Sequence, residues 1–321
     1  MPKLRQNIVT GDWVIIAPER SMRPLDYVQK NPKKIETDKA CPFCHGGKAT
    51  KDIIKSAGTE DVFVIQNGYP AFKDCGERVI LEGQEFYFST PSRGAHEVII
   101  SRHHNIPLFE MSENLLAQYI RTYRQRIKFH SENPEIEHSM IIHNCGLAAG
   151  ASITHPHSQL FCSSILPPFI KKEIDGSREY WLKRGGCVFC DILREEEKTG
   201  VRIIYKNKYF IAFTFFASRF PFEIWILPYE HKDDFQDIDD HEIDALADAM
   251  KETFSKLGKK LNNPDLNFWV HSVPYRHPSK EYYHWHLEIA PRLSKYGGYE
   301  LGSGIITDIV SPESAAKFLT E

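Results

Sequence analysis

The sequence predicts an α+β fold built from two similar halves. Two observations support this prediction. Runs of β-branched and aromatic residues, which are typical of strands, are more frequent than amphipathic helical patterns. In addition, one order of motifs occurs twice, and each copy begins with a Cys-x-x-Cys pair and later carries a His-x-His pair. The boundary is expected near residue 180, which gives halves of residues 1–180 and 181–321.

The first half contains one expected helix among several strands. Apolar residues at helical spacing indicate the helix from Glu113 to Phe129. Runs rich in β-branched residues indicate the strands. Their ranges are 62–67, 96–104 and 139–144, followed by the run THPHSQLF at 154–161.

The second half repeats this order. A helical pattern runs from His241 to Leu257, and a final helix is expected to begin at Ser311 and Pro312. Between the halves, the segment 167–186 combines Pro, Gly and many charges, as expected of a surface connection. The strand-like ranges of this half are 209–216, 222–231, 267–272 and 284–291.

The overall charge argues against two classes of partner. Lys and Arg number 40 against 43 Asp and Glu, a formal net charge of -3, so no general positive field attracts nucleic acid or an anionic membrane. No apolar run is long enough to span a bilayer, and the N-terminus lacks the apolar core of a signal peptide. The sequence therefore predicts a cytoplasmic protein that binds neither nucleic acid nor membrane.

Four of the 7 cysteines form two Cys-x-x-Cys pairs, which indicates metal sites. In a chain without export signals, such pairs bind metal more often than they form disulfides. Zinc takes four ligands in a tetrahedron, and each pair supplies two thiolates. The repeated histidines supply the remaining ligands. The sequence thus predicts two structural zinc sites, formed by Cys41, Cys44, His104 and His155 and by Cys187, Cys190, His231 and His284.

Other interpretations of these pairs stay open. The cysteines could be buried apolar residues or a redox motif of the thioredoxin type. His103 could replace His104 as a ligand, since only the comparison of the two copies favours His104. A nucleic-acid zinc ribbon is weakly supported, because its two pairs lie roughly 15 to 20 residues apart and these lie much farther apart.

The run THPHSQL predicts a nucleophile. Residues two apart on an extended chain point to the same side, so a zinc-bound His155 presents His157 beside it. Imidazole suits attack on phosphorus because it is partly neutral at physiological pH and forms a phosphoramidate that can be transferred again. The small residues of the preceding NCGLAAGAS let backbone amides approach a phosphate. Hydrogen bonds to the phosphate oxygens are expected from Ser152, Ser158 and Gln159.

These motifs resemble those of the galactose-1-phosphate uridylyltransferases of the histidine-triad superfamily. The matching residues are CPFC, His104, GASITHPHSQ and the second pair CVFC, and the resemblance covers nearly the whole chain. It implies two histidine-triad-like halves with antiparallel sheets and packed helices. It also implies exchange of UMP between UDP-glucose and galactose 1-phosphate through a nucleotidyl group on His157, with zinc as the metal, in a homodimer.

The same resemblance implies contacts to the nucleotide sugar and the hexose 1-phosphate. Guanidinium groups suit phosphate oxygens, and two arginines of APERSMRP match the family's nucleotide contacts. A segment near the C-terminus, KYGGYEL, resembles the hexose-binding segment. The implied substrate-binding residues are Arg20, Arg23, Asn67, Asn144, Ser158, Lys295 and Glu300, beside Ser152 and Gln159 at the reacting phosphate.

Departures from the common bacterial pattern leave the substrate open. Ala151, Ile153 and Thr154 replace the residues usual before the His-Pro-His run. The second Cys-x-x-Cys set is similar to a branch with two zinc sites, which includes ADP-glucose phosphorylase-like proteins, rather than to the branch with a carboxylate-histidine iron site. An adenylyltransferase of that type is therefore one alternative, and a histidine-triad nucleotide-binding hydrolase or regulator is another. His286, the counterpart of His157, is expected to be structural or substrate-lining.

Overall fold

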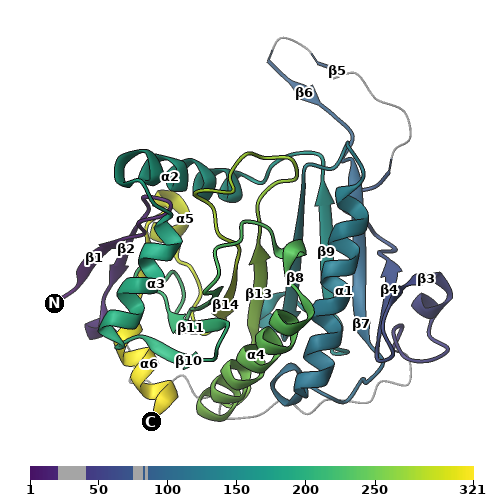
Figure 1. The fold of residues 1–321 in the computed structure, drawn as a ribbon. Coiled ribbons are helices and arrows are strands. Elements are labelled where there is room, and N and C mark those ends of the chain that lie inside the picture. The colour runs from purple at the N-terminus through teal and green to yellow at the C-terminus, as the bar shows by residue number, and fades with distance from the viewer. Residues whose placement is uncertain (21–40, 75–81, 84–85) are drawn as a thin grey trace.

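Strands from both halves form one ten-stranded sheet in the computed structural model, which describes residues 1–20, 41–74, 82–83 and 86–321 (Figure 1). All neighbouring strands in this sheet are antiparallel. In spatial order they are β10 (Ile203–Lys206), β11 (Phe210–Thr214), β12 (Ile224–Pro228), β14 (His286–Pro291), β13 (Leu266–His271), β8 (His138–Cys145), β9 (His157–Ser163), β7 (Gly94–Ser101), β4 (Val62–Gln66) and β3 (Ile53–Gly58).

Strands β8 and β13 join the two halves. β8 pairs with β9 on one side and with β13 on the other, and the second pairing sets Asn144 opposite Asn267. The halves therefore share one continuous sheet. The segment 167–186, expected as a surface connection, is mostly helix α2 (Pro168–Arg184), which ends at Gly185 with a φ of 74°. Residue 180 lies within this helix.

Helices cover the two faces of the sheet differently. Helices α1 (Glu113–Ser131) and α4 (Asp240–Leu261) pack on one face across both halves, which we call the helix face (Figure 1). The opposite face, which we call the front face, is covered by α2 and α3 (Val188–Thr199) over the strands of the second half. The front face of the first half instead meets the segment around Phe43.

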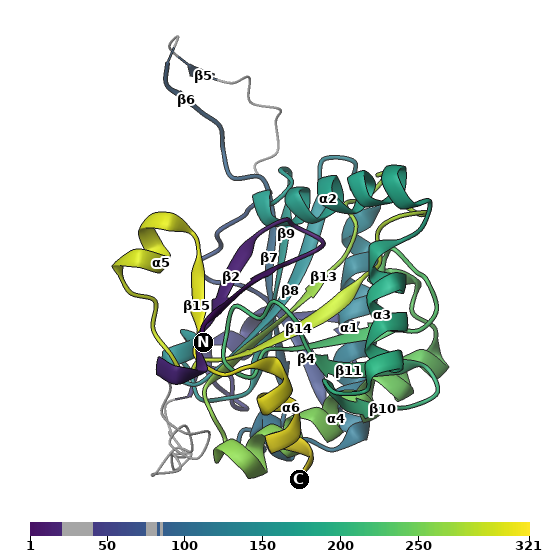
Figure 2. The same cartoon turned by 90° about the vertical axis from the view of Figure 1, so that its left-hand side faces the viewer.

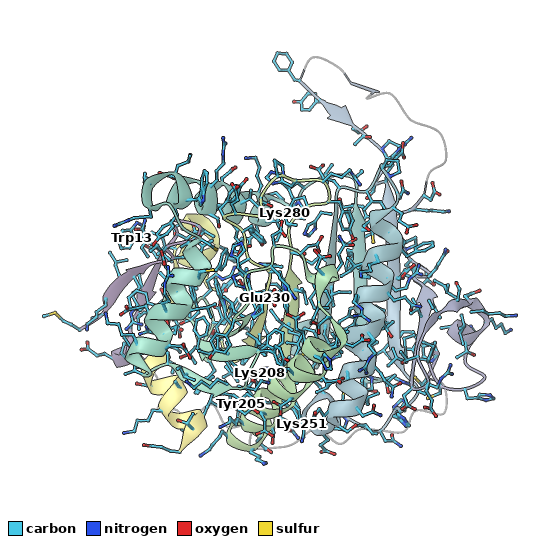
Figure 3. The ribbon with its side chains drawn as sticks, in the orientation of Figure 1. Trp13, Tyr205, Lys208, Glu230, Lys251 and Lys280 are labelled. Carbon is cyan, nitrogen blue, oxygen red and sulfur yellow. The ribbon has the colours of Figure 1, made fainter. Side chains whose placement is uncertain are left out.

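Local sequence explains where the two long helices begin. The Ser112 hydroxyl accepts a hydrogen bond from the backbone N–H of Leu115, and Asp239 forms a capping box with Glu242. Both helices were predicted from apolar spacing, and both are confirmed. The Tyr205 hydroxyl on β10 donates to Asp248 on α4 over 2.7 Å and ties this helix to the edge of the sheet (Figure 3).

The chain ends form a smaller unit against the second half (Figure 2). Its three-stranded sheet has the order β1, β2, β15. Ser311 caps the last helix, as the sequence predicts. Among the described residues, no helix combines the length and the apolar character needed to cross a membrane. The elements of this unit are β1 (Lys3–Gln6), β2 (Trp13–Ile16), β15 (Ile306–Asp308), α5 (Gly298–Ser303) and α6 (Pro312–Thr320).

A separate pair of short strands, β5 (Glu82–Gly83) and β6 (Phe88–Ser89), projects from the molecule (Figure 1).

A buried charge cluster fastens α1 to the helix face of β7. Arg126 donates two hydrogen bonds to the Glu97 carboxylate over 2.8 and 2.7 Å, and His130 lies 2.9 Å from the same carboxylate. Burial alone would raise the pKa of Glu97, but hydrogen bonds from His130 and Arg126 outweigh it and lower the pKa. Glu97 is therefore ionised at neutral pH and depends on its cationic partner.

Replacing Arg126 with Met should lower the free energy of unfolding by about 3–5 kcal/mol, because it leaves the Glu97 carboxylate buried without its guanidinium. Urea denaturation of the metal-loaded protein measures this change. Arg121→Met is the matched control on the same helix. It removes an exposed pair with Asp244 and should cost at most about 1 kcal/mol. Equal losses in the two variants would contradict the assigned role of Arg126.

Candidate active site

His157 begins β9 and faces the front of the sheet. It pairs with Ile100 of β7, and its side chain is 8% exposed. The ring of Phe43 contacts it edge-on, with 5.2 Å between ring centroids. Gln159 lies two residues farther along β9 and so shares this face. The structure thus brings the predicted nucleophile and one predicted phosphate contact to the same surface.

One ring nitrogen of His157 is fixed by the backbone. Nδ1 lies 2.8 Å from the carbonyl oxygen of His155, which can only accept, so the neutral ring carries its proton on Nδ1. The lone pair is then on Nε2. Burial lowers the pKa of His157, against a smaller opposing effect of this hydrogen bond, and favours the neutral ring. The predicted nucleophile therefore carries its lone pair on Nε2, which the sequence could not show.

The four ligands predicted for the first metal site converge. Cys44 Sγ lies 3.1 Å from His104 Nδ1 and 3.7 Å from His155 Nδ1, and Cys41 Sγ lies 3.5 Å from His155 Nδ1. Zinc bond lengths at tetrahedral angles require sulfur-to-nitrogen separations of about 3.5 Å. His155 Nε2 donates to the Ser101 carbonyl oxygen over 2.6 Å, which turns the Nδ1 lone pair toward the thiolates. This donor set fits a tetrahedral metal ion.

The second predicted set converges in the same way. Cys190 Sγ lies 3.2 Å from His231 Nδ1 and 3.8 Å from His284 Nδ1, and Cys187 belongs to the same group of possible metal ligands. His231 Nε2 donates to the Lys280 carbonyl oxygen over 2.7 Å. Both sets could hold a metal ion.

His103 and His104 point in different directions. His103 turns away from the thiolates, and its Nε2 lies 3.0 Å from the Asp61 carboxylate. His104 is the residue within the cluster.

Residues of the second half hold the loop that precedes the nucleophile strand. The Asn267 amide on β13 donates to Asn144 Oδ1 over 2.7 Å and to the Ala149 carbonyl oxygen over 2.8 Å. The Asp265 carboxylate accepts from the backbone N–H of Ala148 over 2.7 Å. Gly146 has a φ of 86°, and a Cβ there would lie 1.9 Å from Asp265. The loop is therefore shaped by the neighbouring half as well as by its small residues.

The remaining predicted phosphate contacts differ in direction. Ser152 is exposed on this loop, whereas Ser158 alternates with His157 and Gln159 and points to the helix face. Its hydroxyl lies 2.5 Å from the Tyr123 hydroxyl and 2.9 Å from His143 Nδ1. The structure therefore places Ser158 in the packed interface behind the strand, on the opposite face from His157.

Sequence reasoning missed His96, which lies on the front face of β7. Its Nε2 is 2.8 Å from Gln159 Oε1 and 3.1 Å from the Asn67 amide, and its ring stacks on Phe161 at 3.9 Å. Asn67 and Gln159, both predicted substrate contacts, thus meet at one imidazole. The signal for His96 was its two-residue spacing within the strand-like run HEVII, which puts it on the same face as Val98 and Ile100.

The predicted hexose segment lies apart from His157 within this chain. Arg20 ends a short 3-10 turn, Pro18–Arg20, and Arg23 lies outside the described residues. Lys295 is exposed, and Glu300 caps α5 by accepting from the Gly297 N–H over 2.9 Å. Both views of the ribbon show α5 apart from β9 (Figures 1 and 2).

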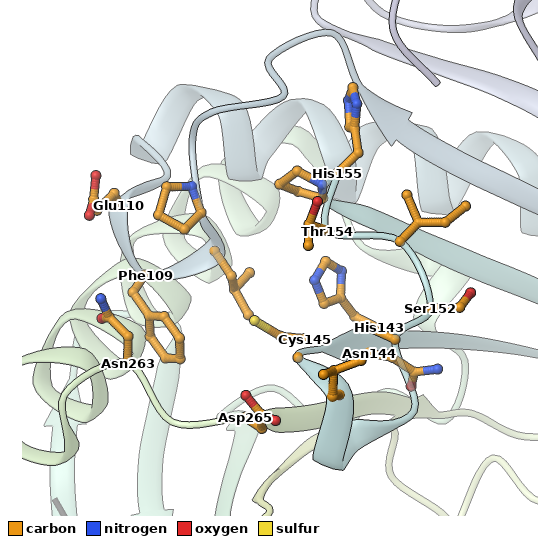
Figure 4. A pocket seen from close by; sticks show the side chains of 17 residues that line it. Phe109, Glu110, His143, Asn144, Cys145, Ser152, Thr154, His155, Asn263 and Asp265 are labelled. Carbon is orange, nitrogen blue, oxygen red and sulfur yellow. The ribbon is translucent and has the colours of Figure 1, made fainter. Parts of the chain in front are cut away.

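A cavity of about 400 Å³ lies behind the loop (Figure 4). His143 points into it from the helix face of β8, and the 3-10 turn Leu108–Glu110 forms the opposite wall. The cavity therefore adjoins the loop that precedes β9, and its lining also includes Asn144, Ser152 and His155. Its side walls come from Cys145, Leu147, Ile153, Thr154, Asn263 and Asp265.

The counterpart of the nucleophile has different surroundings. His286 Nδ1 lies 3.1 Å from the His284 carbonyl oxygen, as in the first half, but Nε2 faces Glu288 at 3.4 Å and Glu173 at 3.7 Å. Burial would lower the pKa of His286, yet these carboxylates raise it to about 10. With His271, these residues form a third buried group that could hold a metal ion, although Arg219 already pairs with Glu288. The sequence signal missed was Glu288, which alternates with His284 and His286.

This chain is similar to proteins of a known family. A family model described as galactose-1-phosphate uridyl transferase, N-terminal domain, matches residues 1–167, and one described as scavenger mRNA decapping enzyme C-term binding matches residues 186–295. ADP-glucose phosphorylase from Arabidopsis thaliana is 32% identical over 100% of this chain and 93% of the relative. Galactose-1-phosphate uridylyltransferase from Thermotoga maritima is 26% identical over 100% of this chain and 98% of the relative.

A solved structure extends this similarity to three dimensions. The ADP-glucose phosphorylase from Arabidopsis thaliana with bound ADP-glucose has a TM-score of 0.84 and 30% sequence identity, and the match covers 100% of this chain and 99% of that one. The family model spans the half that carries CPFC and the His-Pro-His run, and the relatives align over both halves. The protein belongs to the galactose-1-phosphate uridyl transferase family.

Proposed function

We propose that this protein is a nucleotidyltransferase that exchanges UMP between UDP-glucose and galactose 1-phosphate through a covalent nucleotidyl group on His157. The observation that carries this proposal is the fixed tautomer of His157, whose Nδ1–H is held by the His155 carbonyl oxygen. A buried neutral imidazole with a directed Nε2 lone pair is suited to attack on phosphorus.

Two displacements complete the reaction. In the first, Nε2 of His157 forms a bond to the α-phosphorus of UDP-glucose. The bond from that phosphorus to the bridging oxygen breaks, and glucose 1-phosphate leaves with the electron pair. In the second, a phosphate oxygen of galactose 1-phosphate attacks the same phosphorus, and Nε2 leaves with its electron pair. Nδ1 keeps its proton throughout, because the carbonyl oxygen accepts it in both steps.

Hydrogen-bond donors near His157 are assigned to the phosphate. Gln159 lies on the same face two residues away, and Ser152 is exposed on the adjoining loop. Negative charge is spread over the non-bridging oxygens in the transition state, so donors fixed in advance lower the barrier. The acceptor for the second step is a sugar phosphate, and Arg20 and Arg23 are proposed phosphate contacts.

A second candidate is favoured by a specific observation. The Arabidopsis relative described as ADP-glucose phosphorylase is 32% identical over this whole chain, against 26% for the Thermotoga uridylyltransferase. An enzyme of that type would carry AMP on His157 and pass it to inorganic phosphate. The covalent chemistry is the same, so the base and the acceptor distinguish the two candidates. Release of free nucleoside monophosphate without any acceptor would instead indicate the hydrolase alternative.

Zinc is the proposed metal at both Cys2His2 sites. Thiolate and imidazole donors at near-tetrahedral separations favour it, and four protein ligands leave no open position for substrate. When bound, the ion supplies rigidity. At the first site it would fix His155, whose carbonyl oxygen sets the tautomer of His157.

A homodimer is also proposed. Lys295 and Glu300 resemble hexose-binding residues, but α5 lies apart from β9 within one chain, so the partner subunit would supply this segment. A cytoplasmic location stays a prediction.

Incubation with UDP-glucose should add one UMP to the protein, and incubation with ADP-glucose one AMP if the second candidate is correct. Mass spectrometry of the intact protein measures the adduct. An adduct that survives alkali and is lost in acid is identified as a phosphoramidate. His157→Gly is expected to carry no adduct. His286→Gln, the change at the counterpart in the second half, is expected to carry the adduct. An adduct of full yield in the His157 variant would refute the proposed nucleophile.

Replacing Cys44 with Ser should remove about one of two zinc equivalents per chain and reduce nucleotidyl transfer sharply, because it releases His155 beside the nucleophile. Cys190→Ser should remove the other equivalent with a smaller effect on transfer. Cys145→Ser, outside both clusters, is the control and should retain both. Elemental analysis counts the metal. Two retained equivalents in either ligand variant would contradict the assignment.

A further inference from the structure

Two side-chain amides flank His157 on the front face. Gln159 lies two residues along β9. Asn144 is the last residue but one of the neighbouring strand β8. The β8–β9 register pairs His143 with Ser158, so the next step along it places Asn144 opposite His157. An amide has an accepting oxygen and a donating NH2 group, and only the NH2 group stabilises charge on a phosphoryl oxygen. The orientation of both amides therefore matters to transfer.

His96 fixes the Gln159 amide. The backbone N–H of Ala71 donates to His96 Nδ1 over 3.1 Å, so that nitrogen is unprotonated and the neutral ring carries its proton on Nε2. Nε2–H then donates to Gln159 Oε1 over 2.8 Å, since the other nearby atom, the Asn67 amide nitrogen at 3.1 Å, cannot accept a hydrogen bond. Burial lowers the pKa of His96, against a weaker opposing effect of Gln159, and keeps the ring neutral. A backbone donor thus determines which end of Gln159 is held.

Asn267 fixes the Asn144 amide. The β13–β8 register sets these residues opposite each other, so Asn267, Asn144 and His157 form one row across three adjacent strands. The Asn267 NH2 group donates to Asn144 Oδ1 over 2.7 Å and to the Ala149 carbonyl oxygen over 2.8 Å. Because both of these acceptors are oxygens, the NH2 end of Asn267 must face them. The oxygen of Asn144 is therefore occupied.

The two amides share one arrangement. Each oxygen accepts a hydrogen bond from a partner whose own orientation is fixed, and neither amide nitrogen meets an acceptor among the residues that the structure describes. We propose that His96 and Asn267 are positioning residues, which hold the NH2 groups of Asn144 and Gln159 ready for the phosphoryl oxygens at His157. This proposal rests on the proposed function of His157.

Paired double-variant cycles test the proposal. In the zinc-loaded full-length protein, His96→Leu should slow single-turnover transfer from UDP-glucose or ADP-glucose by about tenfold or more. If His96 acts through Gln159, His96→Leu should cause no further loss in a Gln159→Ala background. His96→Gln, with an amide donor near the position of Nε2, should restore much of the rate. The KM for the nucleotide sugar should change less than the rate.

The second cycle pairs Asn267→Leu with Asn144→Ala. Asn267→Leu should slow transfer by about tenfold or more, and its effect should be smaller in the Asn144→Ala background. Asn207→Leu is the matched control, because Asn207 also donates two hydrogen bonds from its amide, to Ala245 and Asp248, beside β10. It should lower thermal stability to a similar extent and leave the transfer rate unchanged.

Binding of UMP and AMP, measured by calorimetry on the same variants, separates this proposal from the proposed function. If no adduct forms on the wild-type protein but monophosphate binding shows the same coupling, the proposed function fails and the positioning role stands. If adducts form but the rate loss of each double variant equals the product of the losses of its two single variants, the positioning role is overturned and the proposed function stands. Single variants within twofold of wild type overturn it as well. A wild-type protein that binds neither monophosphate overturns both.

Discussion

The antiparallel pairing of β8 with β13 is the constraint on which the arrangement of residues around His157 on the front face depends. Main-chain hydrogen bonds across this pair fuse the halves into one sheet and fix the register that sets Asn267 opposite Asn144. The carboxylate of the neighbouring Asp265 then accepts a hydrogen bond from the Ala148 N–H in the loop that precedes β9. A shift of one residue in this register would turn the side chains of β13 to the other face. The first half carries the proposed nucleophile, but the loop before it takes its shape from the second half.

Duplication of the fold has preserved backbone geometry more closely than chemistry. In each half, a histidine of a His-x-His run places Nδ1 against the carbonyl oxygen of the candidate metal ligand two residues earlier. Around His157 the neighbours are amides and small loop residues. Around His286 they are Glu173 and Glu288, and all three residues are fully buried. The same local conformation therefore presents the proposed nucleophile in one half and a buried histidine beside two carboxylates in the other.

Sequence reasoning succeeded where the signal is local. Helical spacing located α1 and α4, and repeated motifs located the two metal-ligand sets. It failed where a role depends on the partner across the sheet. His96 and Asn267 carry no motif, because their relevance arises from register with Gln159 and Asn144. Ser158 was assigned to the phosphate by its place in the motif, although strand alternation turns it toward Tyr123.

The alternation of β7 has a consequence for how such a protein diverges. Glu97 faces α1 and belongs to the buried charge cluster, whereas the adjacent His96 faces the side of the sheet that carries His157. Successive residues of one strand thus meet separate surroundings. Changes at every second position can alter which donors face a bound molecule and leave the helix-packed interior intact. Because the two faces of the sheet can change independently, relatives that act on different nucleotides can retain the same scaffold.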